Sequence, residues 1–120
     1  MTELKAQVID VAGAPWERLL SSVADSHYGM KSIIQDAETG VELFGIRYEA
    51  GEKTPWHRHN CSHGIYVLEG TLYTSIGNFG PGNFVWFPEG IVAEHGATAD
   101  GPVSTLFFTN KKFDIERVQD

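Results

Sequence analysis

Four of the five histidines lie between residue 57 and residue 95, and three of them fall within seven residues. His57, His59 and His63 are an even number of positions apart, so on an extended segment their side chains project from one face. Imidazole is the commonest metal ligand near neutral pH, because the ring offers a lone pair without first losing a proton. The spacing therefore predicts a site for one divalent metal ion. His95, which follows a later strand and turn, is the candidate for a fourth ligand.

Three other residues, His27, Cys61 and Glu94, could take part in such a site, but each also has a simpler interpretation. His27 lies in a polar segment, and we expect an ordinary surface histidine there. Cys61 shares the parity of His59 and His63 and could approach the ion, but a turn after His59 more simply carries it away. Glu94 is either an acceptor for an imidazole N–H or a solvated loop charge, and the sequence leaves both open.

Short strands separated by turns must position these side chains. Thirteen glycines and five prolines divide the chain into runs rich in β-branched and aromatic residues. Such regular spacing favours an all-β sandwich or barrel. The expected strands are Gln7 to Val11, Met30 to Ile34, Val41 to Ala50, Gly64 to Leu68, Thr71 to Ile76, Asn83 to Phe87, Val103 to Thr109 and Phe113 to Val118.

Two local features qualify this pattern. Residues Pro15 to Ala24 are the one helical candidate, with at most two turns, because Pro15 suits the first turn of a helix. In the run from residue 41 to residue 50, the polar residues Glu42 and Arg47 differ in parity. A β-bulge at Gly45 would account for the change of face.

Length and charge limit the classes of partner. The 120 residues suffice for a single domain over residues 1–120, and a net charge of −7 argues against nucleic acid or an anionic membrane. No apolar run approaches the roughly 20 residues of a membrane helix, and the polar first residues lack the apolar segment of a signal peptide. The single cysteine fits a reducing compartment. We therefore expect a cytoplasmic protein whose partner is a small-molecule substrate.

The stretch from about residue 41 to residue 109 resembles the cupin superfamily, because it carries both cupin motifs. The first motif is a glycine, five residues, His-x-His, a glutamate three or four residues later and a closing glycine, and this chain has Gly51, His57-Arg58-His59, His63 and Gly70. The second is a glycine, five residues, Pro-x-Gly and a histidine, and this chain has Gly82, Pro88-Glu89-Gly90 and His95. The resemblance implies the cupin double-stranded β-helix, a jelly-roll barrel, here with a short N-terminal helical turn.

The chain departs from the cupin motifs at two positions. His63 stands where the first motif has its glutamate, which makes a four-histidine, all-nitrogen site like that of a minority of cupins. His95 comes two residues after the usual motif position, which Ala93 occupies. The loop after Gly90 must therefore bulge to deliver His95, or the site has three histidines.

An all-nitrogen site favours a particular class of substrate. Neutral ligands leave the charge of the ion uncompensated, so an anionic bidentate substrate such as an enolate, a hydroxy-ketone or a carboxylate suits it. Imidazole does not choose sharply among iron, manganese, nickel, copper and zinc. The stretches from residue 36 to 40 and from residue 106 to 109 also resemble the cupins that include acetylacetone dioxygenase, dihydroxyacetophenone dioxygenase and the zinc-binding domain of an anti-sigma factor.

We therefore expect a metal-dependent dioxygenase acting on a small oxygenated substrate of the diketone or hydroxy-ketone type. The alternative is a non-catalytic metal- or ligand-binding module with a sensory or regulatory role. A sugar isomerase or epimerase is a weaker alternative, because the sequence offers no clear carboxylate or His–Asp pair as base. Of the basic residues, only Arg47 and Arg58 lie near the motifs and could meet a sugar phosphate.

Aromatic residues on strands that flank the ligands are candidates for the wall of a substrate pocket, although each could equally fill the core. They are Phe44, Trp56, Tyr66, Tyr73, Phe84, Trp86 and Phe107. The resemblance also implies a homodimer, and exposed strand edges give a physical reason for one. The strand expected at Gln7 to Val11 is the candidate edge or swapped element.

Overall fold

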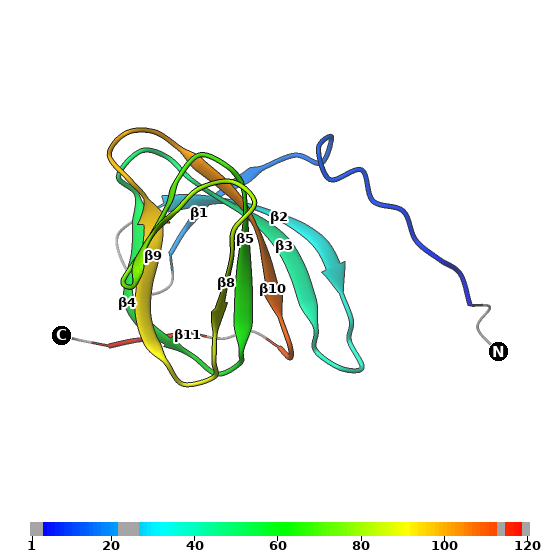
Figure 1. Ribbon diagram of the computed structural model, residues 1–120. Coiled ribbons are helices and arrows are strands. Elements are labelled where there is room, and N and C mark those ends of the chain that lie inside the picture. The colour runs from blue at the N-terminus through cyan, green and yellow to red at the C-terminus, as the bar shows by residue number, and fades with distance from the viewer. Residues whose placement is uncertain (1–3, 22–26, 113–114, 119–120) are drawn as a thin grey trace.

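The protein is a barrel built from two antiparallel sheets (Figure 1), described by a computed structural model over residues 4–21, 27–112 and 115–118. These residues form eleven strands and no helix, so none of them belongs to a helix that could span a membrane. The strands are β1 (Glu17–Leu20), β2 (His27–Gln35), β3 (Glu42–Tyr48), β4 (Lys53–His59), β5 (His63–Glu69), β6 (Leu72–Thr74), β7 (Gly77–Phe79), β8 (Phe84–Phe87), β9 (Val92–Ala97), β10 (Val103–Thr109) and β11 (Ile115–Arg117).

The larger sheet has the strand order β1-β2-β3-β10-β5-β8, and the smaller sheet has the order β11-β4-β9-β6-β7. All the pairs are antiparallel. Neighbours such as β3 and β10 are distant in sequence, as a jelly roll requires. The expected all-β cupin barrel is confirmed.

Alternation along the strands separates the core from the surface. In β5, Ile65 and Val67 are buried inside the barrel, whereas Tyr66 and Leu68 point outward and are exposed. The inward side chains from both sheets pack into one hydrophobic core. Its buried members are Phe44, Ile46, Tyr48, Ile65, Val67, Leu72, Val85, Phe87, Ala93, Ala97, Val103 and Phe107.

The expected β-bulge at Gly45 is wrong. β3 pairs with β10 in unbroken register, and the irregularity lies in the neighbouring strand β2, between Ser32 and Ile34. Gly45 is a glycine for another reason. A Cβ atom there would lie 2.9 Å from both the Lys31 and the Trp16 side chains, which cover the outside of β3. Both faces of β3 are therefore covered. This explains why polar and apolar residues do not alternate regularly along the strand.

The N-terminal expectations are also wrong. The helical turn expected at Pro15 to Ala24 is strand β1 instead, since residues 17–20 pair with β2; residues 22–24 lie outside the described part of the chain. No strand forms at Gln7 to Val11. Residues 7–10 are exposed and Val11 is half-buried, and the segment pairs with no strand among the described residues. Residues that favour strands form one only where a partner strand is present.

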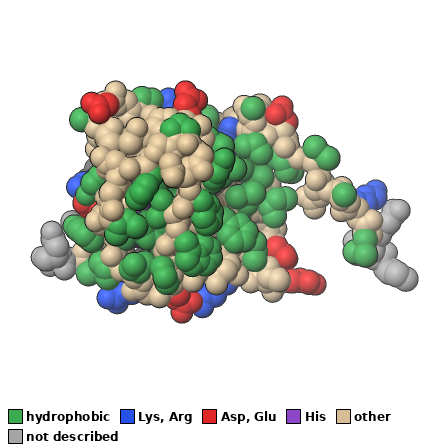
Figure 2. All heavy atoms as spheres, viewed as in Figure 1, with side chains coloured by type: hydrophobic (Ala, Val, Ile, Leu, Met, Phe, Trp, Pro, Cys, Tyr) green, Lys and Arg blue, Asp and Glu red, His purple; other side chains and the backbone are tan. Residues whose placement is uncertain are grey.

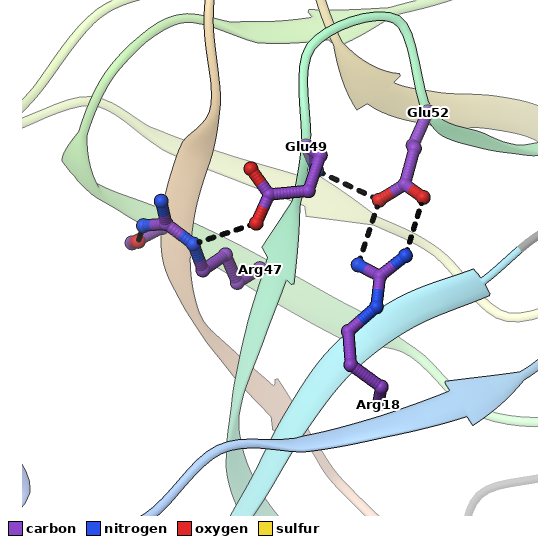
Figure 3. A network of polar contacts seen from close by, with 5 residues as sticks. Arg18, Arg47, Glu49 and Glu52 are labelled. Atoms are coloured by element: carbon purple, nitrogen blue, oxygen red, sulfur yellow. Dashed lines mark hydrogen bonds and ion pairs between the residues drawn. The ribbon is translucent and has the colours of Figure 1, made fainter.

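A network of ion pairs fixes the turn between β3 and β4, just ahead of the strand that carries two of the histidines (Figure 3). Arg18 of β1 holds Glu52 with two parallel hydrogen bonds of 3.0 and 2.7 Å, and Glu52 accepts a third from the backbone N–H of Glu49. Arg47 donates to Glu49 and to Ser104 of β10. The edge of the larger sheet is thereby tied to the entrance of β4.

Candidate metal centre

Three strands bring the histidines of the two motifs to one end of the barrel interior. β4 carries His57 and His59, β5 begins with His63, and β9 carries His95. All four side chains are almost completely buried. The ring centroids of His57 lie 4.8 Å from those of both His59 and His95, and those of His59 and His63 lie 3.8 Å apart.

Three of the four offer ligand atoms close enough for one ion. Ligand atoms of His57, His59 and His95 all lie within 4.8 Å of one another. The Nε2 atoms of His57 and His59 are 2.9 Å apart. Two imidazoles bound at about 2.1 Å and at right angles to one another would place their nitrogens about 3.0 Å apart. These three histidines could therefore hold a metal ion with little movement.

Hydrogen bonds to the far ring nitrogens fix which atoms face the site. His57 Nδ1 donates to the carbonyl oxygen of Pro55 at 2.5 Å, which leaves Nε2 of His57 with a free lone pair. His95 Nδ1 lies 2.9 Å from the Tyr48 hydroxyl, and that hydroxyl lies 2.8 Å from Thr54 Oγ1. If Nδ1 donates to Tyr48 and Tyr48 donates to Thr54, Nε2 of His95 is the ligand atom. That atom is buried without a hydrogen-bond partner among the described residues, so its lone pair is available to a metal ion.

Burial keeps the four imidazoles neutral. Desolvation lowers the pKa of His57, and the Pro55 carbonyl and the charge of Glu94 only partly oppose it. Burial and then the neighbouring His63 and His57 lower the pKa of His59 to about 2. The pKa of His63 falls to about 4, again mainly through burial, and burial lowers that of His95 well below its ordinary value. Neutral rings are the form in which imidazole binds metal.

His63 lies beside the group of three but does not join it. Its ring is stacked between Phe87 and Phe107, with both centroid distances 4.9 Å, and its centroid is 6.4 Å from that of His95. His63 Nε2 is nevertheless buried without a hydrogen-bond partner among the described residues. The third histidine of the group is thus His95, from the second cupin motif. It is not His63, which stands at the glutamate position of the first motif.

The loop after Gly90 needs no bulge to deliver His95, so that expectation is wrong. His95 and Ala93 are two residues apart on β9 and therefore face the same side, one pleat apart. The irregularity lies in the partner strand: β4 pairs Thr54 with His95 and His57 with Ala93, so its register shifts between Thr54 and His57. A two-residue displacement of the ligand along β9 is matched by a bulge in β4.

A small cavity of about 70 Å³ opens beside the three histidines. It is bounded mainly by strands β2, β3 and β10 and by the ligand-bearing strands. Its lining residues are Ser21, Tyr28, Met30, Phe44, Ile46, Tyr48, Thr54, His57, His59, His95 and Phe107. No carboxylate, lysine or arginine is among these residues, so a ligand here would meet aromatic and aliphatic walls, a few hydroxyls and imidazole.

Two of the seven aromatic residues expected in the pocket wall line this cavity, namely Phe44 and Phe107. Tyr66, Phe84 and Trp86 instead lie exposed on the outside of β5 and β8. Trp56 and Tyr73 are not among the lining residues either. The sequence reasoning missed Tyr48 and Ile46, although both share the parity of Phe44 on β3 and could have been chosen on that signal.

Glu94, Cys61 and His27 lie outside the group of three. Glu94 is neither an imidazole acceptor nor a solvated loop charge: it is buried on β9, accepts a hydrogen bond from the Tyr73 hydroxyl and pairs with Lys53 at 3.2 Å. It acts on His57 only through its charge. Cys61 is fully buried in the turn after β4, and His27 is exposed at the start of β2.

Comparisons with known families agree with this fold. Residues 4–114 match the family model described as the ChrR cupin-like domain. The chain belongs to this family. Auxin-binding protein 1 of Arabidopsis thaliana is 32% identical over 90 residues, which cover 65% of this chain and 45% of that protein. This chain thus spans less than half the length of that relative.

Solved structures show the same fold at low sequence identity. The polyketide cyclase RemF of Streptomyces resistomycificus superposes with a TM-score of 0.81 at 18% identity, over 97% of this cupin and 87% of RemF. An acetylacetone dioxygenase-like protein of Methylibium petroleiphilum PM1 superposes with a TM-score of 0.80 at 10% identity, over 99% of this chain and 85% of that one. At such identities the likeness establishes the fold alone.

Proposed function

We infer that this cupin is a metal-dependent dioxygenase that acts on a small oxygenated substrate of the diketone or hydroxy-ketone type. The observation that carries the proposal is the wall of the cavity: three neutral imidazoles on one side and apolar side chains opposite, with no charged residue among those lining it. A substrate of this kind needs no ion pair with the protein, because its own oxygens can bind a metal ion.

Different residues of the site would hold the ion and enclose the substrate. His57, His59 and His95 would hold the ion, and we propose His63 as a fourth ligand because its Nε2 is buried without a partner among the described residues. A divalent ion bound there would supply Lewis acidity toward the substrate oxygens and, if redox-active, the capacity to activate dioxygen. Phe44 and Phe107, stacked at 4.8 Å, form an apolar wall that excludes water from the carbon skeleton.

The hydroxyls that could orient a substrate belong to Tyr28, Tyr48, Ser21 and Thr54. Tyr28 and Tyr48 both line the cavity, and burial raises the pKa of each, so both stay protonated at neutral pH. The Tyr48 hydroxyl already contacts His95 and Thr54. Tyr28 is therefore a candidate donor to a substrate oxygen.

Oxygen consumption tests the proposal. We expect protein loaded with iron, manganese, nickel or copper to consume dioxygen with at least one member of a panel of β-diketones and hydroxy-ketones, and His95→Ala to abolish the consumption. His27→Ala, at an exposed histidine outside the group of three, is the matched control and should keep full activity. No uptake by any of the metal-loaded forms would contradict the proposal.

A non-catalytic metal-binding module is the second candidate, and the tight packing of the site favours it. The histidine rings lie 3.8 to 4.8 Å from their nearest neighbours, and the cavity beside them is small. Tight zinc binding with no turnover on the whole panel would favour this function. A sugar isomerase gains no support, because Arg47 is held by Glu49 and Ser104 outside the cavity and Arg58 is exposed.

A further inference from the structure

Among the described residues, Glu94 is the one acidic residue that is buried. The other acidic side chains lie nearer the surface, and Figure 2 shows Asp and Glu at the rim of the face in view, around a centre of hydrophobic side chains. Glu94 points away from the barrel interior, because it alternates along β9 with Ala93 and His95, which face inward. Removing a carboxylate from water is costly, so this position needs partners that compensate for it.

Two side chains meet the two oxygens of Glu94 across the outside of the smaller sheet. The Tyr73 hydroxyl of β6 donates to Oε1, and Nζ of Lys53 on β4 lies 3.2 Å from Oε2. The same ammonium group lies 5.8 Å from the centre of the Tyr73 ring. Lys53 and Tyr73 both stand opposite Gly96, which has no side chain to separate them from Glu94. We call Lys53, Tyr73 and Glu94 the outer network.

The outer network lies behind the histidines, at the bulge in β4. The register between β4 and β9 shifts between Thr54 and His57, and Glu94 is the residue of β9 that stands opposite this shift. Pro55, within the shift, supplies the carbonyl oxygen that accepts the hydrogen bond from His57 Nδ1. The Glu94 carboxylate and the His57 ring therefore lie on opposite faces of one sheet, at the same level along the strands.

The charge of Glu94 reaches the site across this sheet. Burial lowers the pKa of His57, and the charge of Glu94 opposes that effect. A proton and a metal ion compete for the same lone pair of an imidazole. A negative charge that favours the protonated ring therefore also favours the ring that binds a metal cation. This matters here because the histidines are neutral and the residues that line the cavity include no charged side chain.

We propose that the outer network sets the affinity of the site for a cation: the Glu94 carboxylate strengthens the binding of the ion, and the Lys53 ammonium weakens it. The inference rests on the part of the proposed function that places an ion among His57, His59 and His95. The outer network does not line the cavity, so it acts through the field of its charges. The Glu94 side chain is 7% exposed and that of Lys53 is 48% exposed, so water screens the ammonium more strongly and the net effect is attraction.

Zinc affinity, measured by competition with a chromogenic chelator, tests the sign of each charge. Glu94→Gln removes the charge but keeps an oxygen that can accept from Tyr73, and it should weaken zinc binding about tenfold. Lys53→Met keeps most of the apolar stem and should strengthen zinc binding about threefold. A clamp that only held the strands in place would instead lose affinity in both variants.

Glu89→Gln is the matched control, because Glu89 also pairs with a lysine, Lys111 at 2.7 Å, but both side chains are about half exposed. Its zinc affinity should stay within about twofold of the wild type. Weaker binding in both test variants, or no change in either, would overturn the proposal, as would a wild type that binds no zinc. Thermal melting of the metal-free variants verifies that each is folded. If Glu94→Gln does not fold, Lys53→Met decides alone, and affinity equal to or below that of the wild type overturns the proposal.

The reduction potential of the copper-loaded protein gives a second readout, because a nearby charge acts more strongly on Cu(II) than on Cu(I). Glu94→Gln should raise the potential measured by voltammetry, and Lys53→Met should lower it. Shifts of the same sign in both variants would contradict the electrostatic role. Neither measurement uses an organic substrate or dioxygen, so a failed oxygen-consumption test would reject the dioxygenase and leave this inference standing.

Discussion

The Tyr48 hydroxyl determines how one of the histidines can act. It is buried and lies between Thr54 Oγ1 and His95 Nδ1. Such contacts to the far nitrogen orient a ligating imidazole and select its tautomer. Tyr48 thus links the core, where its ring packs, to the site, where its hydroxyl fixes His95.

Tyr48→Phe should weaken metal binding about 10- to 100-fold, because His95 loses the partner that holds its Nε2 toward the site. Competition with a chromogenic chelator would measure the change. Tyr66→Phe removes a hydroxyl on the outside of the barrel and should leave the affinity unaltered. Equal affinities for the two variants would show that the Tyr48 hydroxyl does not position His95.

At the scale of elements, the close approach of β9 to the start of β4 determines the spacing of the site. Gly96 follows His95, and a Cβ atom on it would lie 2.3 Å from the carbonyl oxygen of Glu52 and 2.5 Å from Lys53 Cα. The Ala97 N–H donates to that same Glu52 carbonyl. A larger residue at position 96 must therefore separate two strands that carry all three members of the histidine group.

Gly96→Ala should destabilise the protein by more than about 2 kcal/mol, since the obstructing atoms belong to the backbone and cannot rotate away. Urea unfolding of the metal-free protein would measure this. Gly80→Ala is the matched control, because a Cβ atom there meets nothing within 4 Å, and its effect should stay within about 0.5 kcal/mol. A similar loss in both variants would contradict the role given to the close approach.

The sequence predicted some elements well and missed others for identifiable reasons. The strand expected at Val103 to Thr109 has those bounds in the structure, and Gly64 to Leu68 lies within β5, because β-branched and aromatic residues fill both. β4 and β9 were not predicted as strands: Pro55, three histidines and Gly96 give them a composition that only the barrel context turns into strands. The bulge in β4 that aligns His57 with His95 depends on the pairing between strands, so no local pattern reveals it.

At the scale of the whole molecule, an ion held by the group of three histidines would couple metal binding to folding, because it would join β4 to β9, which lie far apart in sequence. Metal at about 100 times its dissociation constant should raise the free energy of unfolding by about 2.7 kcal/mol and the melting temperature by about 10 °C. Differential scanning calorimetry with and without a chelator would measure the shift. His57→Ala should abolish it and His27→Ala should preserve it; a shift that survives in His57→Ala would place the ion elsewhere.

The strand that carries His57 and His59 lies next to the edge of its sheet. Among the described residues, the three-residue β11 pairs with residues 57–59 of this strand, and the Val118 N–H donates to the Trp56 carbonyl oxygen. A strand this short detaches far more readily than the barrel unfolds, and its detachment exposes the backbone of both histidines to water. We therefore expect fraying of β11, rather than global unfolding, to limit how fast an ion held by these histidines would enter and leave. Amide hydrogen exchange at residues 57–59 should then occur at the same rate as metal release.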